Sequence, residues 1–193
     1  MLAAARTAFA ATGYDATSIR TIASGAGVDP ALVHHYFGSK DKLFLAAIDA
    51  PADPAQMLPE VLAGGTADLG ANVLLMFLRV WDGPARAAGL ALVRSAVSNE
   101  WTARLLREFL VTRVLRPVVG PLDLPPDEGA ARGALVASQL VGLVMARYVL
   151  CLEPVASATG PEIVAAYAPT LQRYLTGDVA LPGSPQSPGG GTP

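Results

Sequence analysis

The chain has 193 residues, of which 52% are hydrophobic and 16% are charged. This length suits one large domain, or a small domain joined to a medium one, and the apolar content excludes a disordered chain. The single cysteine, Cys151, excludes a disulfide framework and a cysteine-based zinc site. The net charge of −2 provides no overall attraction to nucleic acid or to an anionic membrane, so such binding requires a local patch.

Helical spacing dominates the sequence. Apolar residues recur at intervals of three and four, whereas alternating strand patterns and Asn-Gly turns are missing. The prolines at 117–126 and 154–161 predict breaks between the last helices. We therefore expect an all-α fold with helices over residues 2–12, 18–26, 30–37, 40–49, 66–82, 84–98, 100–116, 127–152 and 161–176.

The same pattern divides the chain into three parts. Residues 1–50 form a head of short helices, residues 51–176 form a larger helical body, and the tail 177–193 has too little apolar content to pack and is expected to be disordered. The most apolar stretch, 133–152, is uncharged only from 133 to 146, which is too short for a membrane span and favours a buried helix. No secretory signal follows Met1, so we expect a cytoplasmic protein without a membrane partner.

Residues 18–37 predict a helix-turn-helix. Thr17 or Ser18 supplies an N-cap hydroxyl for the first helix, and Gly27 permits a sharp exit from it. Asp29 followed by Pro30 is typical of the start of a second helix. A second helix with small residues at its start and polar aromatic residues on its outer face suits the major groove of DNA.

The second helix has two expected faces. Val33, Tyr36 and Phe37 should face the core of the head, whereas Ala31, His34 and His35 point outward. Lys40 follows the turn after this helix and is placed for a phosphate contact. Neighbouring histidines do not share a helix face and no third ligand is near, so we expect neither a metal site nor a cofactor.

The stretch G-V-D-P-A-L-V-H-H-Y-F-G-S-K-D-K-L-F from residue 27, together with Thr17-Ser18 and Ile22-Ala23, resembles the TetR family of bacterial transcriptional regulators. The resemblance implies a homodimeric repressor that binds double-stranded, palindromic operator DNA and releases it when a small-molecule effector enters the body. It implies dimerisation through residues 127–152 and 161–176. It also implies DNA contacts by Thr17, Ser18, Pro30, Ala31, Leu32, His34, His35, Tyr36 and Lys40.

Two features depart from the family pattern. The first helix opens abruptly at Met1 without preceding basic residues, so we expect the front of the head to be missing from this sequence. Residues 1–50 also carry four acidic and four basic residues, which is a weak charge balance for binding phosphates. The alternative hypothesis is a helical small-molecule-binding or interaction protein whose truncated head no longer binds DNA.

The body carries no catalytic pattern. Both histidines lie in the head, so no Ser-His-Asp or Cys-His system can form in the body, and we expect no enzyme. Apolar helices with occasional polar groups instead predict a pocket for an organic ligand. The candidates, for each of which ordinary packing is the alternative, are Met57, Leu62, Leu75, Met76, Arg94, Gln139 and Arg147.

Overall fold

The computed structural model describes residues 1–48, 50 and 53–180, and these contain helices and connections but no strand. The all-α prediction is thus confirmed. The expected disorder of the tail falls mainly on residues 181–193, which lie outside the described residues, as does Asp49 at the end of the expected helix 40–49.

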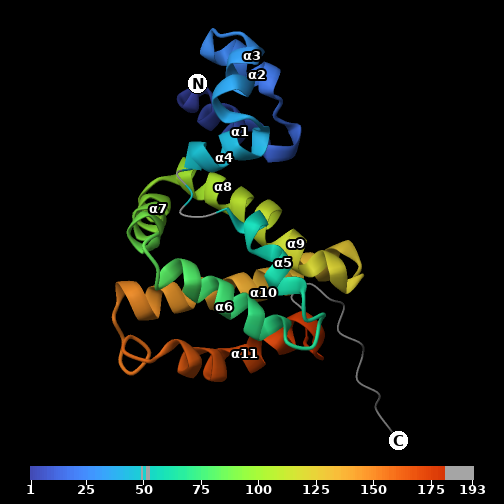
Figure 1. Ribbon diagram of the computed structural model, residues 1–193, viewed down its shortest axis with the longest axis vertical. Helices are drawn as coiled ribbons and strands as arrows, with labels where there is room; N and C mark the ends of the chain where they lie inside the picture. The colour runs from blue at the N-terminus through green and yellow to red at the C-terminus, as the bar shows by residue number, and fades with distance from the viewer. Residues whose placement is uncertain (49, 51–52, 181–193) are drawn as a thin grey trace, which may run out of the picture.

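Four short helices form the head: α1 (Leu2–Ala16), α2 (Ile19–Ala26), α3 (Pro30–Phe37) and α4 (Lys40–Ile48). In Figure 1 they lie at one end of an elongated molecule, and α8 runs between them and the layer that contains α6, α10 and α11. The body consists of η1 (Pro54–Gln56), α5 (Leu58–Leu62), α6 (Leu69–Trp81), α7 (Arg86–Ser98), α8 (Glu100–Phe109), η2 (Leu110–Leu115), α9 (Arg116–Val119), η3 (Gly120–Leu122), α10 (Pro126–Val144), η4 (Met145–Val149) and α11 (Gly160–Thr176).

Local capping explains the helix-turn-helix. The Ser18 hydroxyl accepts a hydrogen bond from the Thr21 backbone N–H at 3.0 Å, which caps α2. Gly27 then adopts a left-handed conformation with φ of 66°, which glycine tolerates without steric cost. The Asp29 carboxylate accepts from the Ala31 N–H at 2.7 Å and caps α3, with Pro30 as its first residue.

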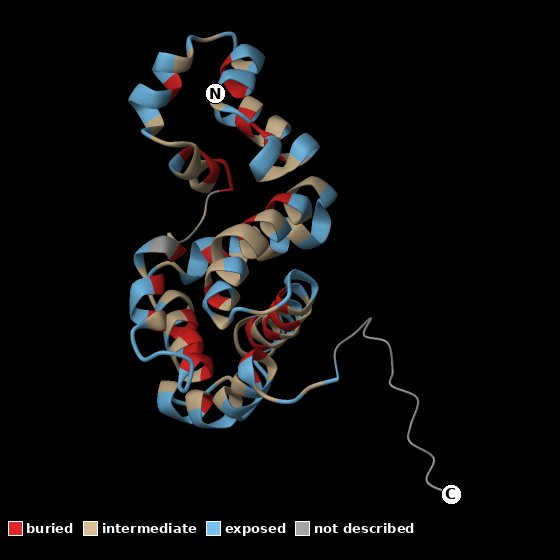
Figure 2. Cartoon of the chain, turned by 90° about the vertical axis from the view of Figure 1, so that its right-hand side faces the viewer, coloured by how far each residue is buried: buried red, intermediate tan, exposed pale blue. Residues whose placement is uncertain are grey.

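Buried side chains form two clusters, and α8 contributes to the cluster in the head. Leu105 and Phe109 of α8 are 1% and 7% exposed and pack with Phe9, Ile22 and Phe44. The other cluster fills the body between α6, α10 and α11. Figure 2 shows buried residues gathered where helices face one another, both in the head and in the body. The head core therefore depends on a helix that belongs to the body by sequence.

The helices differ from expectation at two places. Pro117 was expected to break the chain, but the helical path continues through α9 to Val119. The π-helical segment η2 ends at Leu115, two residues before Pro117, so the missing proline N–H falls where the hydrogen-bond pattern already changes. No helix was expected at 54–62 either, where η1 and α5 lie, because these pieces are too short for a periodic pattern.

The apolar helix α10 continues through the π-helical segment η4. Together they run from Pro126 to Val149, 24 residues that are long and apolar enough by length and composition to cross a membrane. The expectation that this stretch is too short was wrong, because the helix extends beyond both ends of the uncharged part. Only 28% of its most apolar window is buried within the chain, so the buried helix that we expected has a large exposed face.

Candidate DNA-binding surface and ligand cavity

The outer face of α3 presents a group of neighbouring side chains to solvent. Ala31, Leu32, His34, His35 and Tyr36 are all exposed, Leu32 by 42% and Tyr36 by 65%. The expectation that Tyr36 packs in the core was wrong. Val33 and Phe37 already fill the inner face, and the Tyr36 ring instead packs edge-on against His35 at 5.4 Å. These residues thus form a surface on one short helix, with the half-buried Pro30 at its start.

Thr17 and Ser18 differ in what they can offer to DNA. Thr17 is 2% exposed, and its hydroxyl donates to the Gly13 carbonyl at 2.6 Å. The expectation that its side chain anchors a phosphate is therefore contradicted, because this hydroxyl is buried and satisfied inside the head. Ser18 is exposed at the N-terminus of α2. The first turn of a helix leaves backbone N–H groups free, and such groups suit an anion such as a phosphate.

The Lys40 side chain reaches from the start of α4 to the junction of α1 and α2. Its ammonium donates to the Thr17 carbonyl at 2.9 Å and to the Asp15 carbonyl at 3.4 Å, and it lies 4.3 Å from the centre of the Tyr14 ring. The ammonium is thus held at Thr17, the residue that directly precedes Ser18. The side chain remains half-exposed.

Polar contacts connect the head to η2 and α8. The Arg113 guanidinium pairs with the Asp41 carboxylate at 3.0 Å, and the Tyr14 hydroxyl donates to the same carboxylate. The Tyr14 N–H also donates to Glu108 at 2.9 Å. Sequence reasoning missed these pairs, because they join residues that are distant along the chain and belong to no local motif.

A cavity of about 150 Å³ lies in the body between α6, α7, α8, η2 and α10. Met57 and Met76, two of the expected pocket residues, line it; their contact with a ligand stays a prediction. Thirteen further residues complete the wall. They are Pro54, Phe77, Val80, Trp81, Gly89, Leu92, Val93, Leu106, Phe109, Leu110, Val114, Leu140 and Val144.

Four of the other expected pocket residues lie elsewhere. Leu62 packs against the body core, and Leu75 is 51% exposed beside a smaller surface pocket. Arg94 is exposed on α7 and does not line the cavity, so its expected place in the pocket was wrong. Gln139 is half-buried but does not line the cavity. Apolar flanks in the sequence do not reveal which face of a helix a polar residue occupies.

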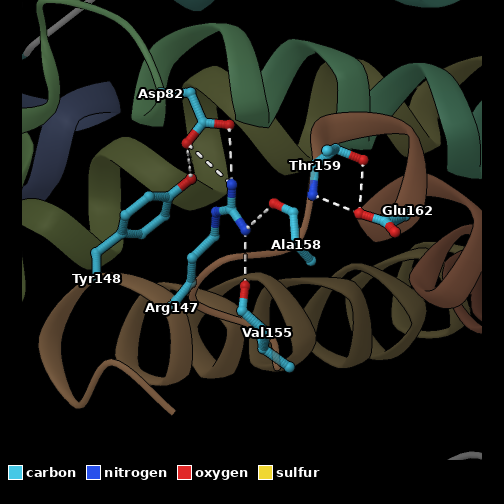
Figure 3. Close-up of polar contacts among 7 residues, drawn as sticks. All are labelled: Asp82, Arg147, Tyr148, Val155, Ala158, Thr159 and Glu162. Atoms are coloured by element: carbon cyan, nitrogen blue, oxygen red, sulfur yellow. Dashed lines mark hydrogen bonds and ion pairs between the residues drawn. The ribbon is translucent and has the colours of Figure 1, made fainter. Parts of the chain in front are cut away.

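Arg147 is buried as expected, but its partners are protein groups (Figure 3). Its side chain is 9% exposed, and one guanidinium nitrogen donates to the Val155 and Ala158 carbonyls, both at 2.7 Å. The other terminal nitrogen pairs with Asp82 at 3.4 Å. Arg147 therefore holds the loop between η4 and α11 and does not line the cavity, which corrects its expected ligand role.

Comparisons with known proteins agree with this architecture. Residues 1–47 match the family described as bacterial regulatory proteins, tetR family, and residues 67–175 match the tetracyclin repressor-like C-terminal domain. The chain is similar to the HTH-type transcriptional regulator BetI of Agrobacterium fabrum, with 36% identity over 76% of this chain and 73% of the relative. The BetI regulator of Rhizobium meliloti is 33% identical over 74% of this chain and 73% of its own length.

The chain is also similar to a solved structure. The crystal structure of a TetR-family regulator from Streptomyces coelicolor A3 is 35% identical in sequence, with a TM-score of 0.46 over 91% of this chain and 92% of that one. The assignment rests on the family matches and on the two BetI relatives. On that evidence, this chain belongs to the TetR family of DNA-binding transcriptional regulators.

Proposed function

We propose that this regulator is a repressor that binds a palindromic operator as a homodimer and releases it when an effector fills the cavity of the body. The observation that carries the proposal is the position of Phe109. This side chain belongs to the buried cluster of the head and also lines the cavity, so one residue is shared by the two parts that must communicate.

The exposed face of α3 is the proposed reading surface. Ala31 and Leu32 lie near its start, where the N-terminal part of a recognition helix meets base edges, and Pro30 leaves that end free of bulk. His34, His35 and Tyr36 would contact the DNA backbone at the rim of the groove. Ser18 and Lys40 would contact phosphate, and in a dimer two copies of α3 would reach half-sites about 34 Å or slightly more apart.

Dimerisation is proposed through the family's usual pair of helices, 127–152 and 161–176. The supporting observation is the exposed apolar face at the end of α10 and beyond it, where Val141 is 50%, Leu150 59% and Leu152 52% exposed. Large apolar side chains exposed in one short segment of the chain suit a partner surface that covers them. Val141→Arg should give a monomer in light scattering, while Val97→Arg, at an 82% exposed position on α7, should leave the dimer intact.

Release of DNA is proposed to pass through η2. Leu110 and Val114 of this segment line the cavity, and Arg113, between them in sequence, pairs with Asp41 of α4. A ligand that moves the cavity wall would therefore shift the contact that holds α4. Since a ligand shifts an equilibrium only by its differential affinity, the cavity must fit the ligand better in the DNA-free arrangement.

We also propose that the chain divides into a DNA-binding head at 1–50, a ligand-binding and dimerisation body at 51–176 and a tail at 177–193. The protein would have no catalytic role and would act in the cytoplasm. Within the described residues no group of three or more His, Cys, Asp or Glu side chains is arranged to hold a metal. Regulators of this family are generally non-enzymatic DNA-binding proteins.

Fluorescence anisotropy with DNA from around the chain's own gene, over a salt series, tests the proposal. If no selective binding is seen there, DNA selected from a random pool replaces it. We expect sequence-selective binding that weakens steeply with salt. Tyr36→Ala should weaken binding to the selected DNA, whereas Val97→Ala should not. Failure to select any sequence from the random pool would contradict the proposal.

A further inference from the structure

We propose that the effector is an uncharged, apolar molecule about as large as a benzene ring with a small alkyl substituent. The inference rests on the proposed function in one respect, because it takes the cavity between α6, α7, α8, η2 and α10 to be the effector site. Its chemical content comes from the cavity wall itself.

The wall offers almost nothing to a polar or ionised group. All fifteen lining residues are apolar or aromatic, and none of them carries a charge. The indole N–H of Trp81 is the only strong side-chain hydrogen-bond donor among these lining residues. A charged ligand would lose its hydration without gaining a counter-ion, which is strongly unfavourable.

The ionised groups in the last turn of α6 and directly after it, Arg79 and Asp82, are already used elsewhere. Arg79 pairs with Glu60 at 2.7 Å on the surface. Asp82 accepts hydrogen bonds from Arg147 and Tyr148 beyond the end of α6. Neither Arg79 nor Asp82 lines the cavity, so neither is placed to neutralise a ligand inside it.

The aromatic residues do not provide a cage for a cation either. A cation binds over an aromatic face. The Trp81 ring, however, is stacked with Phe77 at 5.8 Å and with Tyr148 at 5.7 Å between ring centres. Gly89 lies against its six-membered ring, where a Cβ atom would come within 3.2 Å of Cη2. Trp81 is thus packed as part of the wall, in stacked contact with two other rings.

The size of the cavity sets the size of the ligand. At about 150 Å³ it matches the volume of an engineered apolar cavity that stays dry and binds benzene. A single ring with a small alkyl group is therefore the size class that the cavity accommodates. The bulkier members of this class, such as tert-butylbenzene, press on side chains of η2 or α6, and this displacement is what the proposed release of DNA requires.

Two molecules of the same shape give a direct test. In tert-butylbenzene a neutral carbon carries the three methyl groups, and in phenyltrimethylammonium a positively charged nitrogen carries them. Isothermal calorimetry on the full chain, without DNA, should show that tert-butylbenzene binds at least about 100-fold more tightly than phenyltrimethylammonium, because burying the unpaired charge is costly. Equal affinity, tighter binding of the ammonium ion, or no binding of either would overturn the inference.

Variants locate the binding. Val114→Phe and, independently, Leu140→Phe place a larger side chain in the wall and should weaken tert-butylbenzene binding by about tenfold or more, while Val97→Phe on the exposed face of α7 leaves it unchanged. Circular dichroism identifies which of the two cavity variants remains folded. Unchanged affinity in a folded cavity variant would contradict the site.

Operator binding is measured separately by anisotropy on the same preparations. Loss of operator binding with intact neutral-ligand selectivity would contradict the proposed function alone. Intact operator binding without that selectivity would contradict the inferred ligand class alone.

Discussion

The Tyr148 hydroxyl donates a hydrogen bond to Asp82 Oδ1 across 2.9 Å and so joins η4 to the residue that follows α6 (Figure 3). Burial of the phenol raises the pKa of Tyr148 to about 12, and the hydrogen bond to Asp82 and its negative charge act in the same direction. The neighbouring Arg147 opposes them. The tyrosine is therefore held as the neutral donor in the folded protein.

The first prediction concerns alkaline pH. Because the pKa of Tyr148 is higher in the folded chain than its ordinary value of 10, the stability it contributes is complete below pH 10 and is lost as the pH rises through about 12. An ultraviolet titration of phenolate absorbance should lose a step near pH 12 in Tyr148→Phe. A lost step centred near pH 10 would contradict the raised pKa.

The second prediction concerns the loop after η4. Arg147→Met removes the two hydrogen bonds to the Val155 and Ala158 carbonyls and the ion pair with Asp82. Since it leaves part-buried carbonyl oxygens without their donor, we expect the free energy of unfolding to fall by about 3 kcal/mol in urea denaturation. Arg94→Met, at an exposed position, should change it by less than about 0.5 kcal/mol. Equal effects of both substitutions would show that Arg147 does not hold the loop.

The third prediction concerns the crossing of α6 and α11. A Cβ atom at Gly70 would lie 2.6 Å from the Gln172 backbone nitrogen and 2.8 Å from the Ala168 carbonyl oxygen. Gly70→Ala must therefore separate the two helices, and we expect a loss of about 2–4 kcal/mol in the free energy of unfolding.

Gly120→Ala is the matched control for that change. No heavy atom lies within 4 Å of a Cβ at Gly120, and the backbone there is helical. This substitution should be neutral or stabilise the fold by up to about 1 kcal/mol. If Gly70→Ala were equally harmless in thermal denaturation, the close approach of α6 and α11 would be wrong.

The fourth prediction concerns communication between the cavity and the head. Arg113→Met breaks the ion pair with Asp41 but lies outside the proposed DNA surface. Operator affinity without ligand should change little, whereas the factor by which tert-butylbenzene weakens operator binding should fall by about tenfold, within the usual range of coupling energies. Arg104→Met removes an exposed ion pair with Glu100 on α8 and should leave that factor unchanged. An unaltered factor in Arg113→Met would exclude this route.

The helix-turn-helix could be predicted from the sequence because its signals are local. Ser18, Gly27 and Asp29 act on backbone groups within four residues of themselves, so their types and spacing already indicate where α2 and α3 begin and end. The same logic predicted most helices of the body to within a few residues.

The cavity and the contacts of the head could not be predicted in this way. The lining residues run from Pro54 to Val144 and come together only when η1, α6, α7, α8, η2 and α10 pack, and helical periodicity identifies an apolar face without naming its partner. Thr17 shows the same limit at a single residue: a hydroxyl at a helix start can face solvent or be buried, and here Gly13 O holds it inside the head.

The last prediction concerns Lys40, whose ammonium is held by the Thr17 and Asp15 carbonyls next to the start of α2. An ammonium has three N–H donors, so a phosphate oxygen can be added to these carbonyl contacts. Lys40→Met keeps the apolar part of the side chain but removes the charge. We expect weaker binding to every DNA sequence and a slope of log affinity against log salt that is shallower by about one. Since an anchor to phosphate carries no sequence information, a loss confined to one operator would show that Lys40 acts by positioning α3 instead.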